Sequence, residues 1–162
     1  MCGVELSKMP HMNQANKVAI ASRFNKLDLH DDAFTSLKVY PPRSSSNFTR
    51  VDFEFQDDST GAVKVLSFRS CANFRFIMDF DVLASNWHFG NTKACKARTD
   101  VSRMKKFVRA QQIHWRTTYM PPMHENMPIR KKLASIRSYV WFRVAFTGGT
   151  AEVLAKNYRL KR

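Results

Sequence analysis

Alternating apolar and polar residues predict β-strands along most of this chain. The clearest run covers residues 74–83, where apolar side chains occupy every second position and therefore share one face of a strand. The opposite face of that strand is mostly polar, as in an antiparallel sheet that packs on one side only. Similar patterns predict further strands over residues 34–40, 48–55, 63–68, 139–146 and 151–158.

Two short motifs indicate where predicted strands end. Pro41 and Pro42 follow the first strand, and proline cannot continue a β-ladder because it lacks the backbone N–H. Gly148 and Gly149 separate the last two apolar runs, and a Gly-Gly turn between such runs is a strong hairpin signal. The pattern therefore predicts a β-hairpin near the C-terminus.

Helical spacing of apolar residues occurs in three places. Residues 13–27 contain a partial apolar stripe, and residues 130–137 form a shorter helix candidate. The longest candidate covers residues 100–116, with Thr99 or Asp100 as its N-cap. Its apolar face is formed by Val101, Met104, Val108 and Trp115.

Together these elements predict an α+β fold. We expect a single domain with an antiparallel sheet of about five to six strands and one or two helices packed on one face. Residues 1–32 form an N-terminal polar segment with a helix, and residues 33–162 form the α+β domain with its basic C-terminal half. We expect the core to contain Phe74, Phe76, Met78, Phe80, Val82, Val101, Met104, Val108, Phe142, Val144 and Phe146.

The net charge of the chain lies in its second half. The 162 residues include 27 Lys and Arg against 13 Asp and Glu, which gives a formal net charge of +14. Residues 1–86 contain ten cations and ten acids, whereas residues 87–162 contain 17 cations and three acids. Because each Lys or Arg near a phosphate releases a condensed counterion, this asymmetry indicates a nucleic acid or another acidic partner.

The predicted helix 100–116 and the segments around it supply the candidate binding residues. No acid lies between Asp100 and Glu125, so the cations of this helix have no acidic partner within it. Like charges at i, i+4 destabilise a helix by about 0.2–0.5 kcal/mol per pair, a cost that a polyanion offsets. We expect one continuous phosphate-binding surface formed by Lys93, Arg103, Lys105, Lys106, Arg109, Arg116, Arg130, Lys131, Lys132, Arg137 and the exposed aromatic Trp87.

The leading hypothesis is a non-enzymatic nucleic-acid-binding protein that grips the phosphate backbone through residues 93–137, with DNA and RNA both open. The alternative is a protein-interaction module, of the inhibitor or immunity type, whose basic face covers an acidic protein. Salt separates the two hypotheses, because binding to phosphates weakens steeply as the salt concentration rises. Neither hypothesis requires a cofactor.

A metal-dependent nuclease is the third hypothesis. Asp79 and Asp81 lie two residues apart on a predicted strand, so they project from one face, where two carboxylates can share a divalent cation. Asp52 and Glu54 form a similar pair. The usual nuclease pattern of an Asp followed by Glu-x-Lys is absent, as are nucleophile motifs and zinc-ligand spacings. We therefore assign no catalytic residue and no metal ligand.

The number of cysteines and the length of the apolar runs indicate the cellular location that we expect for this protein. Cys2, Cys71 and Cys95 are odd in number and far apart, which favours reduced thiols in a cytoplasmic protein. No basic stretch followed by an apolar run opens the chain, and no apolar run approaches about 18 residues. We therefore expect neither a signal peptide nor a membrane span.

Overall fold

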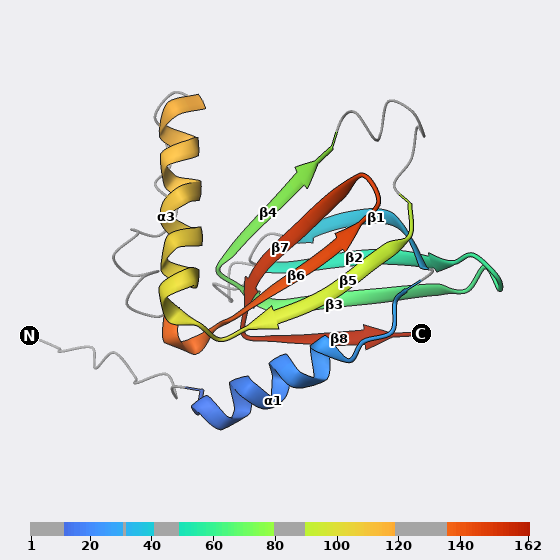
Figure 1. Ribbon diagram of the computed structural model, residues 1–162, viewed down its shortest axis with the longest axis horizontal. Helices are drawn as coiled ribbons and strands as arrows, with labels where there is room; N and C mark the ends of the chain where they lie inside the picture. The colour runs from blue at the N-terminus through green and yellow to red at the C-terminus, as the bar shows by residue number, and fades with distance from the viewer. Residues whose placement is uncertain (1–11, 31, 41–48, 80–89, 119–135) are drawn as a thin grey trace, which may run out of the picture.

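The computed structural model describes residues 12–30, 32–40, 49–79, 90–118 and 136–162, with residues 111–118 as helix backbone (Figure 1). The helices are α1 (Gln14–Asn25), α3 (Val101–Thr118) and the 3-10 helix η1 (Ile136–Ser138). The strands are β1 (Asp32–Tyr40), β2 (Thr49–Asp57), β3 (Val63–Cys71), β4 (Asn73–Met78), β5 (Thr92–Arg98), β6 (Val140–Phe146), β7 (Gly149–Ala155) and β8 (Asn157–Lys161).

These strands form two antiparallel sheets of four strands each. The first sheet has the order β1-β2-β3-β8, and the second has the order β4-β7-β6-β5. Only Ala72 separates β3 from β4, and only Lys156 separates β7 from β8. Ala72 N–H donates to Leu154 O (2.8 Å) and Lys156 N–H donates to Arg69 O (3.2 Å), so pairing continues across the bend. One bent ribbon of paired strands therefore joins the two sheets.

The inner faces of the two sheets enclose an aromatic core. Phe53 and Phe68 of the first sheet and Phe142 of the second sheet are fully buried. Phe34 of β1 stacks on Phe146 of β6 with ring centroids 4.4 Å apart. Successive strand residues point to opposite faces, so alternate positions of β2, β3 and β6 enter this core. Burying each such side chain contributes roughly 1.5–3 kcal/mol.

Helix α1 covers the core beside β5 and β6 (Figure 1). The Asn13 side chain accepts a hydrogen bond from Ala15 N–H (3.1 Å) and so caps the helix, as Asn commonly does. Phe24 near the other end is fully buried, and its ring contacts those of Phe142 (4.8 Å) and Tyr158 (5.0 Å). The helix therefore contributes to the same core as the strands.

One asparagine attaches the end of α1 to β5. The Asn25 side chain accepts a hydrogen bond from Ala97 N–H (2.5 Å) and donates one to Ala97 O (3.5 Å). β6 pairs with β5 on its other side, so this contact satisfies backbone groups on the free edge of β5. An amide that pairs with a strand edge in this way protects the edge from other chains.

Helix α3 packs on the outer face of the second sheet. Met104, Phe107 and Val108 are buried against Leu154 and neighbouring side chains in a cluster separate from the main core. The Phe107 ring stacks on Trp141 of β6 with centroids 5.8 Å apart. Figure 1 shows α3 standing beside the sheets, with one side turned away from the strands.

The structure confirms the α+β class, the antiparallel pairing and the C-terminal hairpin. β6 and β7 pair from Val140 with Ala155 to Phe146 with Gly149, and Gly148 takes a φ of +88° in the turn. Such a turn favours glycine because other side chains rarely adopt a positive φ. Both longer helices form where predicted. Of the shorter candidate, η1 covers its last residues, and residues 130–135 lie outside the described part.

The strand pattern is more divided than the sequence predicts. β5 was not predicted, because three cations among its seven residues hide the alternation. The single run predicted over residues 151–158 divides at Lys156 into β7 and β8, which belong to different sheets. The unpredicted β5 and the division of residues 151–158 explain why eight strands form where five to six were expected.

The predicted core is correct for β6 and partly wrong for β4. Phe74 and Phe76 are partly buried against the core, whereas Met78 is exposed. Phe80 and Val82 lie outside the described residues. The apolar stripe of α3 belongs to the outer cluster instead of the core between the sheets, because that helix packs on the opposite face of the second sheet.

Candidate nucleic-acid interface

Acids of the first sheet pair with cations of the same sheet. The hydrogen bond from Lys38 lowers the pKa of the Glu54 carboxyl, and the hydrogen bond to Asp32 raises the pKa of Lys64. Ion pairs of this kind compensate the positive charge locally. The pairs are Lys38–Glu54 (2.5 Å), Arg50–Asp52 (3.0 Å) and Lys64–Asp32 (2.8 Å).

The outer face of the second sheet also carries more cations than acids. Lys96 of β5 lies directly opposite Arg143 of β6, which lies opposite Glu152 of β7, which lies opposite Arg75 of β4. Glu152 forms an ion pair with Arg75. Lys96 and Arg143 are both exposed, and neither forms an ion pair with a residue that the structure describes. Like charges directly opposite on neighbouring strands repel, so the Lys96–Arg143 pair is unfavourable, and Glu152 on the other side of Arg143 offsets only part of the positive charge of this row.

The exposed side of α3 is also cationic. Successive residues of an α-helix are turned by about 100°, so the buried stripe of Met104, Phe107 and Val108 fixes the direction of the other side chains. Arg103 projects from one flank of this stripe, Lys105 from the other, and Lys106 and Arg109 from the side opposite the stripe. Arg103, Lys106 and Arg109 are exposed, and Lys105 is half-buried.

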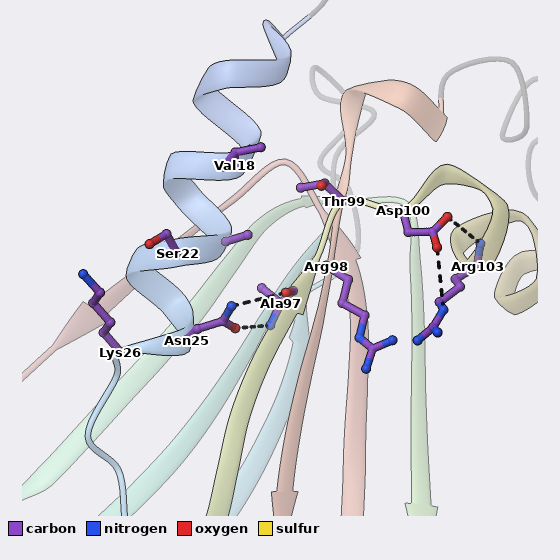
Figure 2. A pocket seen from close by; sticks show the side chains of 10 residues that line it. Val18, Ser22, Asn25, Lys26, Ala97, Arg98, Thr99, Asp100 and Arg103 are labelled. Atoms are coloured by element: carbon purple, nitrogen blue, oxygen red, sulfur yellow. Dashed lines mark hydrogen bonds and ion pairs between the residues drawn. The ribbon is translucent and has the colours of Figure 1, made fainter.

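A pocket of about 580 Å³ lies where α1, β5 and the start of α3 meet (Figure 2). Arg98 and Arg103 extend from opposite walls toward the same region in Figure 2. Asp100 caps α3 by accepting hydrogen bonds from Ser102 N–H (2.9 Å) and Arg103 N–H (3.3 Å). Its other carboxylate oxygen lies 3.6 Å from Arg103 Nε, in an exposed pair that contributes little stability. The pocket connects the cations of β5 with those of α3.

The structure separates several predicted site residues from this surface. Lys93 is exposed at the far end of β5, five residues or about 17 Å from Arg98. Arg137 is an exposed residue of η1 and lies near Lys17 of α1. Burial lowers the pKa of Lys17, and the positive charge of Arg137 lowers it further. Arg116 belongs to α3, and the structure describes only its backbone. Trp87, Arg130, Lys131 and Lys132 lie outside the described residues.

Three cations on this surface were not among the predicted site residues. Lys96 and Arg98 precede the helix in sequence, and only their position on β5 brings them beside Arg143 and Arg103. Arg143 is the one charged position in the alternating run of β6, so it had to project from the face opposite the core. That pattern in the sequence was sufficient to predict that Arg143 faces away from the core. Lys96 and Arg98 could have been assigned to this surface only if β5 had been predicted as a strand.

The two sheets do not divide the charge of the chain between them. The first half of the chain supplies β1 to β4 and the basic second half supplies β5, α3, β6, β7 and β8, so each sheet contains a strand from the other half. β8 places Arg159 and Lys161 on the outer face of the first sheet, which is therefore also basic. The second sheet differs because α3 adds its cations there.

The structure describes three of the four acids named in the nuclease hypothesis. Asp79 follows β4 and donates its backbone N–H to Gly148 O (2.9 Å), and Asp81 lies outside the described residues. Asp52 and Glu54 are engaged with Arg50 and Lys38. No group of three or more His, Cys, Asp or Glu within the described ranges is arranged to hold a metal ion.

Two further observations complete the description of the chain. Among the helices that the structure describes, none is both long enough and apolar enough to cross a membrane. A comparison of the chain with protein-family models, with curated proteins and with solved structures found no match in any of the three.

Proposed function

We propose that this chain is a non-enzymatic nucleic-acid-binding protein that grips the phosphate backbone through one basic surface. This basic surface consists of Lys96 and Arg98 of β5, Arg143 of β6 and the exposed cations of α3. The observation that supports the proposal is its charge balance. Apart from the exposed pair of Arg103 with Asp100, these cations form no ion pair with a described residue. Arg69, Arg159 and Lys161 of the first sheet are likewise exposed and without an ion pair among the described residues, but the basic surface also contains the cations of α3, which packs on the second sheet.

Physical chemistry favours a polyanion as the partner of such a surface. The cations come from three elements, and Arg98 of β5 and Arg103 of α3 line one pocket at the start of α3, so the positive potential extends over more than one strand or one turn of helix. Phosphates are spaced along a nucleic acid and neutralise several cations at once, with release of condensed counterions. Contacts of this kind position the nucleic acid and carry no sequence information by themselves.

The test measures binding of labelled single-stranded and duplex oligonucleotides by fluorescence anisotropy over about 50 to 200 mM salt. We expect the logarithm of the affinity to fall linearly with the logarithm of the salt concentration. A triple variant with Lys96→Gln, Arg98→Gln and Arg143→Gln removes three exposed cations of the basic surface. Its salt slope should be smaller by about three units, because each lost phosphate contact releases about one counterion fewer.

The matched control removes the same charges from the outer face of the first sheet. The triple variant Arg69→Gln, Arg159→Gln and Lys161→Gln again replaces two arginines and one lysine, all exposed. We expect it to bind like the parent, apart from a small long-range effect that salt screens. Equal losses in the two variants would mean that binding follows total charge. If the parent binds no nucleic acid, the proposal is wrong and an acidic protein becomes the leading partner.

A further inference from the structure

The exposed side of α3 combines three properties that a helix in a nucleic-acid groove requires. Half of residues 101–110 are exposed, and they gather on one side of the helix. Ser102, Lys106 and Arg109 lie nearly opposite the buried stripe. Cations project from both flanks, with Arg103 on one side and the half-buried Lys105 on the other. A helix between two phosphate backbones needs positive charge on both flanks and short or hydrogen-bonding side chains between them.

The neighbouring strand adds to one of these flanks. Arg98 of β5 extends toward the same region as Arg103 in the pocket at the start of α3 (Figure 2). Two guanidinium groups therefore lie on one flank, while Lys105 lies on the other. Two acids are described near this surface. Asp100 pairs with Arg103, and Glu152 forms an ion pair with Arg75. The charge on both flanks is thus complementary to two phosphate strands.

We infer that α3 inserts into the major groove of B-form duplex DNA, with Lys106 toward the base edges and the flanking cations on the two phosphate strands. This inference rests on the proposed function and specifies its ligand. The major groove of B-DNA is about 12 Å wide and admits an α-helix, whose diameter with side chains is about 10–12 Å. The major groove of A-form RNA is too deep and narrow for this mode of binding.

The dimensions of α3 agree with this arrangement. Its 18 residues give a helix about 27 Å long. Met104, Phe107 and Val108 anchor its first turns on the second sheet, so the helix is held rigidly where the flanking cations project. A lysine near the base edges can donate to guanine O6 and N7. Lys106 is the side chain in position to do so.

The first experiment compares three ligands of the same sequence: duplex DNA, duplex RNA, and duplex DNA whose cytosines bear glucosylated 5-hydroxymethyl groups. The glucose fills the major groove and leaves the phosphates and the minor groove unchanged. We expect the unmodified duplex DNA to bind at least about tenfold more tightly than either of the other two. Netropsin, which occupies the minor groove, should not displace the protein.

The second experiment uses a matched pair of single substitutions. Lys106→Ala should weaken binding to duplex DNA about tenfold, because it removes both a base-edge contact and a charge. Lys161→Ala removes the same charge from β8 and should change the affinity less than about twofold. Circular dichroism of both variants checks that α3 remains folded.

The outcomes separate this inference from the proposed function. Equal affinity for all three duplexes, or displacement by netropsin, overturns the insertion of α3 and leaves backbone binding intact. Equal affinities of Lys106→Ala and Lys161→Ala also overturn it. Binding to no nucleic acid at all overturns the proposed function, and with it the role of α3.

Discussion

Acidic side chains of the first sheet neutralise particular cations, and most of these partners are far apart in the sequence. Lys64 pairs with Asp32, 32 residues away, and Lys38 pairs with Glu54, 16 residues away. Each pair depends on the register of neighbouring strands, since side chains meet only at opposed or diagonal positions. A count of charges along the chain therefore shows how much positive charge is uncompensated, and only residue contacts show where it lies.

Burial also determines the chemistry of the two described cysteines. Desolvation raises the pKa of the Cys71 thiol to about 12, and that of Cys95 likewise to about 12. A raised pKa keeps the thiol protonated at neutral pH, and the thiolate is the reactive form. Both side chains are therefore expected to be chemically inert in the folded protein.

We predict that a Cys2→Ser variant reacts slowly with Ellman's reagent at about pH 8 in its native state. Two thiols should become reactive when guanidinium chloride unfolds the chain, because exposure restores the ordinary pKa near 9.0. Absorbance of the released thiolate measures both rates. Rapid reaction of either thiol in the native state would contradict the burial of that cysteine.

At the scale of elements, β5 depends on its neighbours more than on its own sequence. Its apolar content is low, and three of its seven residues are exposed cations. β6 pairs with it on one side, and the side chain of Asn25 occupies part of its other edge. Thr92 at its start donates a side-chain hydrogen bond to Asp32 O (3.0 Å), which links it to β1. Tertiary pairing thus overrides weak strand propensity in this segment.

We predict that Asn25→Ala lowers the free energy of unfolding by about 1–3 kcal/mol, because it removes two hydrogen bonds and leaves backbone groups of Ala97 unpaired. Asn16→Ala is the matched control, since Asn16 is exposed on the same helix. This control should be neutral or slightly stabilising, because alanine is the better helix former. Chemical denaturation measures both variants. Equal stabilities of Asn25→Ala and the parent would show that the contact does not hold α1 on β5.

At the scale of the whole molecule, α1 couples the two sheets. The Phe24 ring contacts Phe142 of the second sheet, and it contacts Tyr158 and Phe68 (6.0 Å) of the first sheet. The N-terminal segment and the strands therefore share one core, although the polar character of residues 1–32 suggested a distinct segment. A single core of this kind unfolds cooperatively.

We predict that Phe24→Ala costs about 3–5 kcal/mol of stability, as other large-to-small changes at fully buried aromatic positions do. Thermal unfolding followed by circular dichroism and by tryptophan fluorescence should still give one coincident transition. Val18→Ala on the same helix is the control and should change stability little, because Val18 is 51% exposed. Separate transitions for helix and sheet signals in the parent would contradict a shared core.

The sequence was most informative where a single face of an element is buried. The alternation of β6 placed Phe142 and Val144 in the core, and the stripe of α3 placed Met104 and Val108 inside a packed surface. These patterns survive because burial of one face requires periodicity of 2 in a strand and 3.6 in a helix. The same periodicity fixed the outward direction of Arg143 and of the α3 cations.

The periodicity of apolar residues does not indicate where a strand bends from one sheet into the other. The chain passes from β3 to β4 and from β7 to β8 with one intervening residue each time, and Ser70 adopts a φ of 53° at the first bend. Nothing in the composition of these runs distinguishes a straight strand from one that crosses between two sheets. The division into two sheets, and hence the two outer faces, comes from packing of both halves of each ribbon on the aromatic core.

The sequence by itself determined the α+β class, the terminal hairpin, the position of α3 and the concentration of positive charge after residue 86. These features depend on local periodicity, turn residues and charge counts, which are properties of neighbouring residues. The tertiary structure decided which acids neutralise which cations, and it brought Lys96 and Arg98 beside Arg143 and Arg103. Those relations depend on strand order and register, because side chains from distant parts of the chain meet only after the sheets have formed.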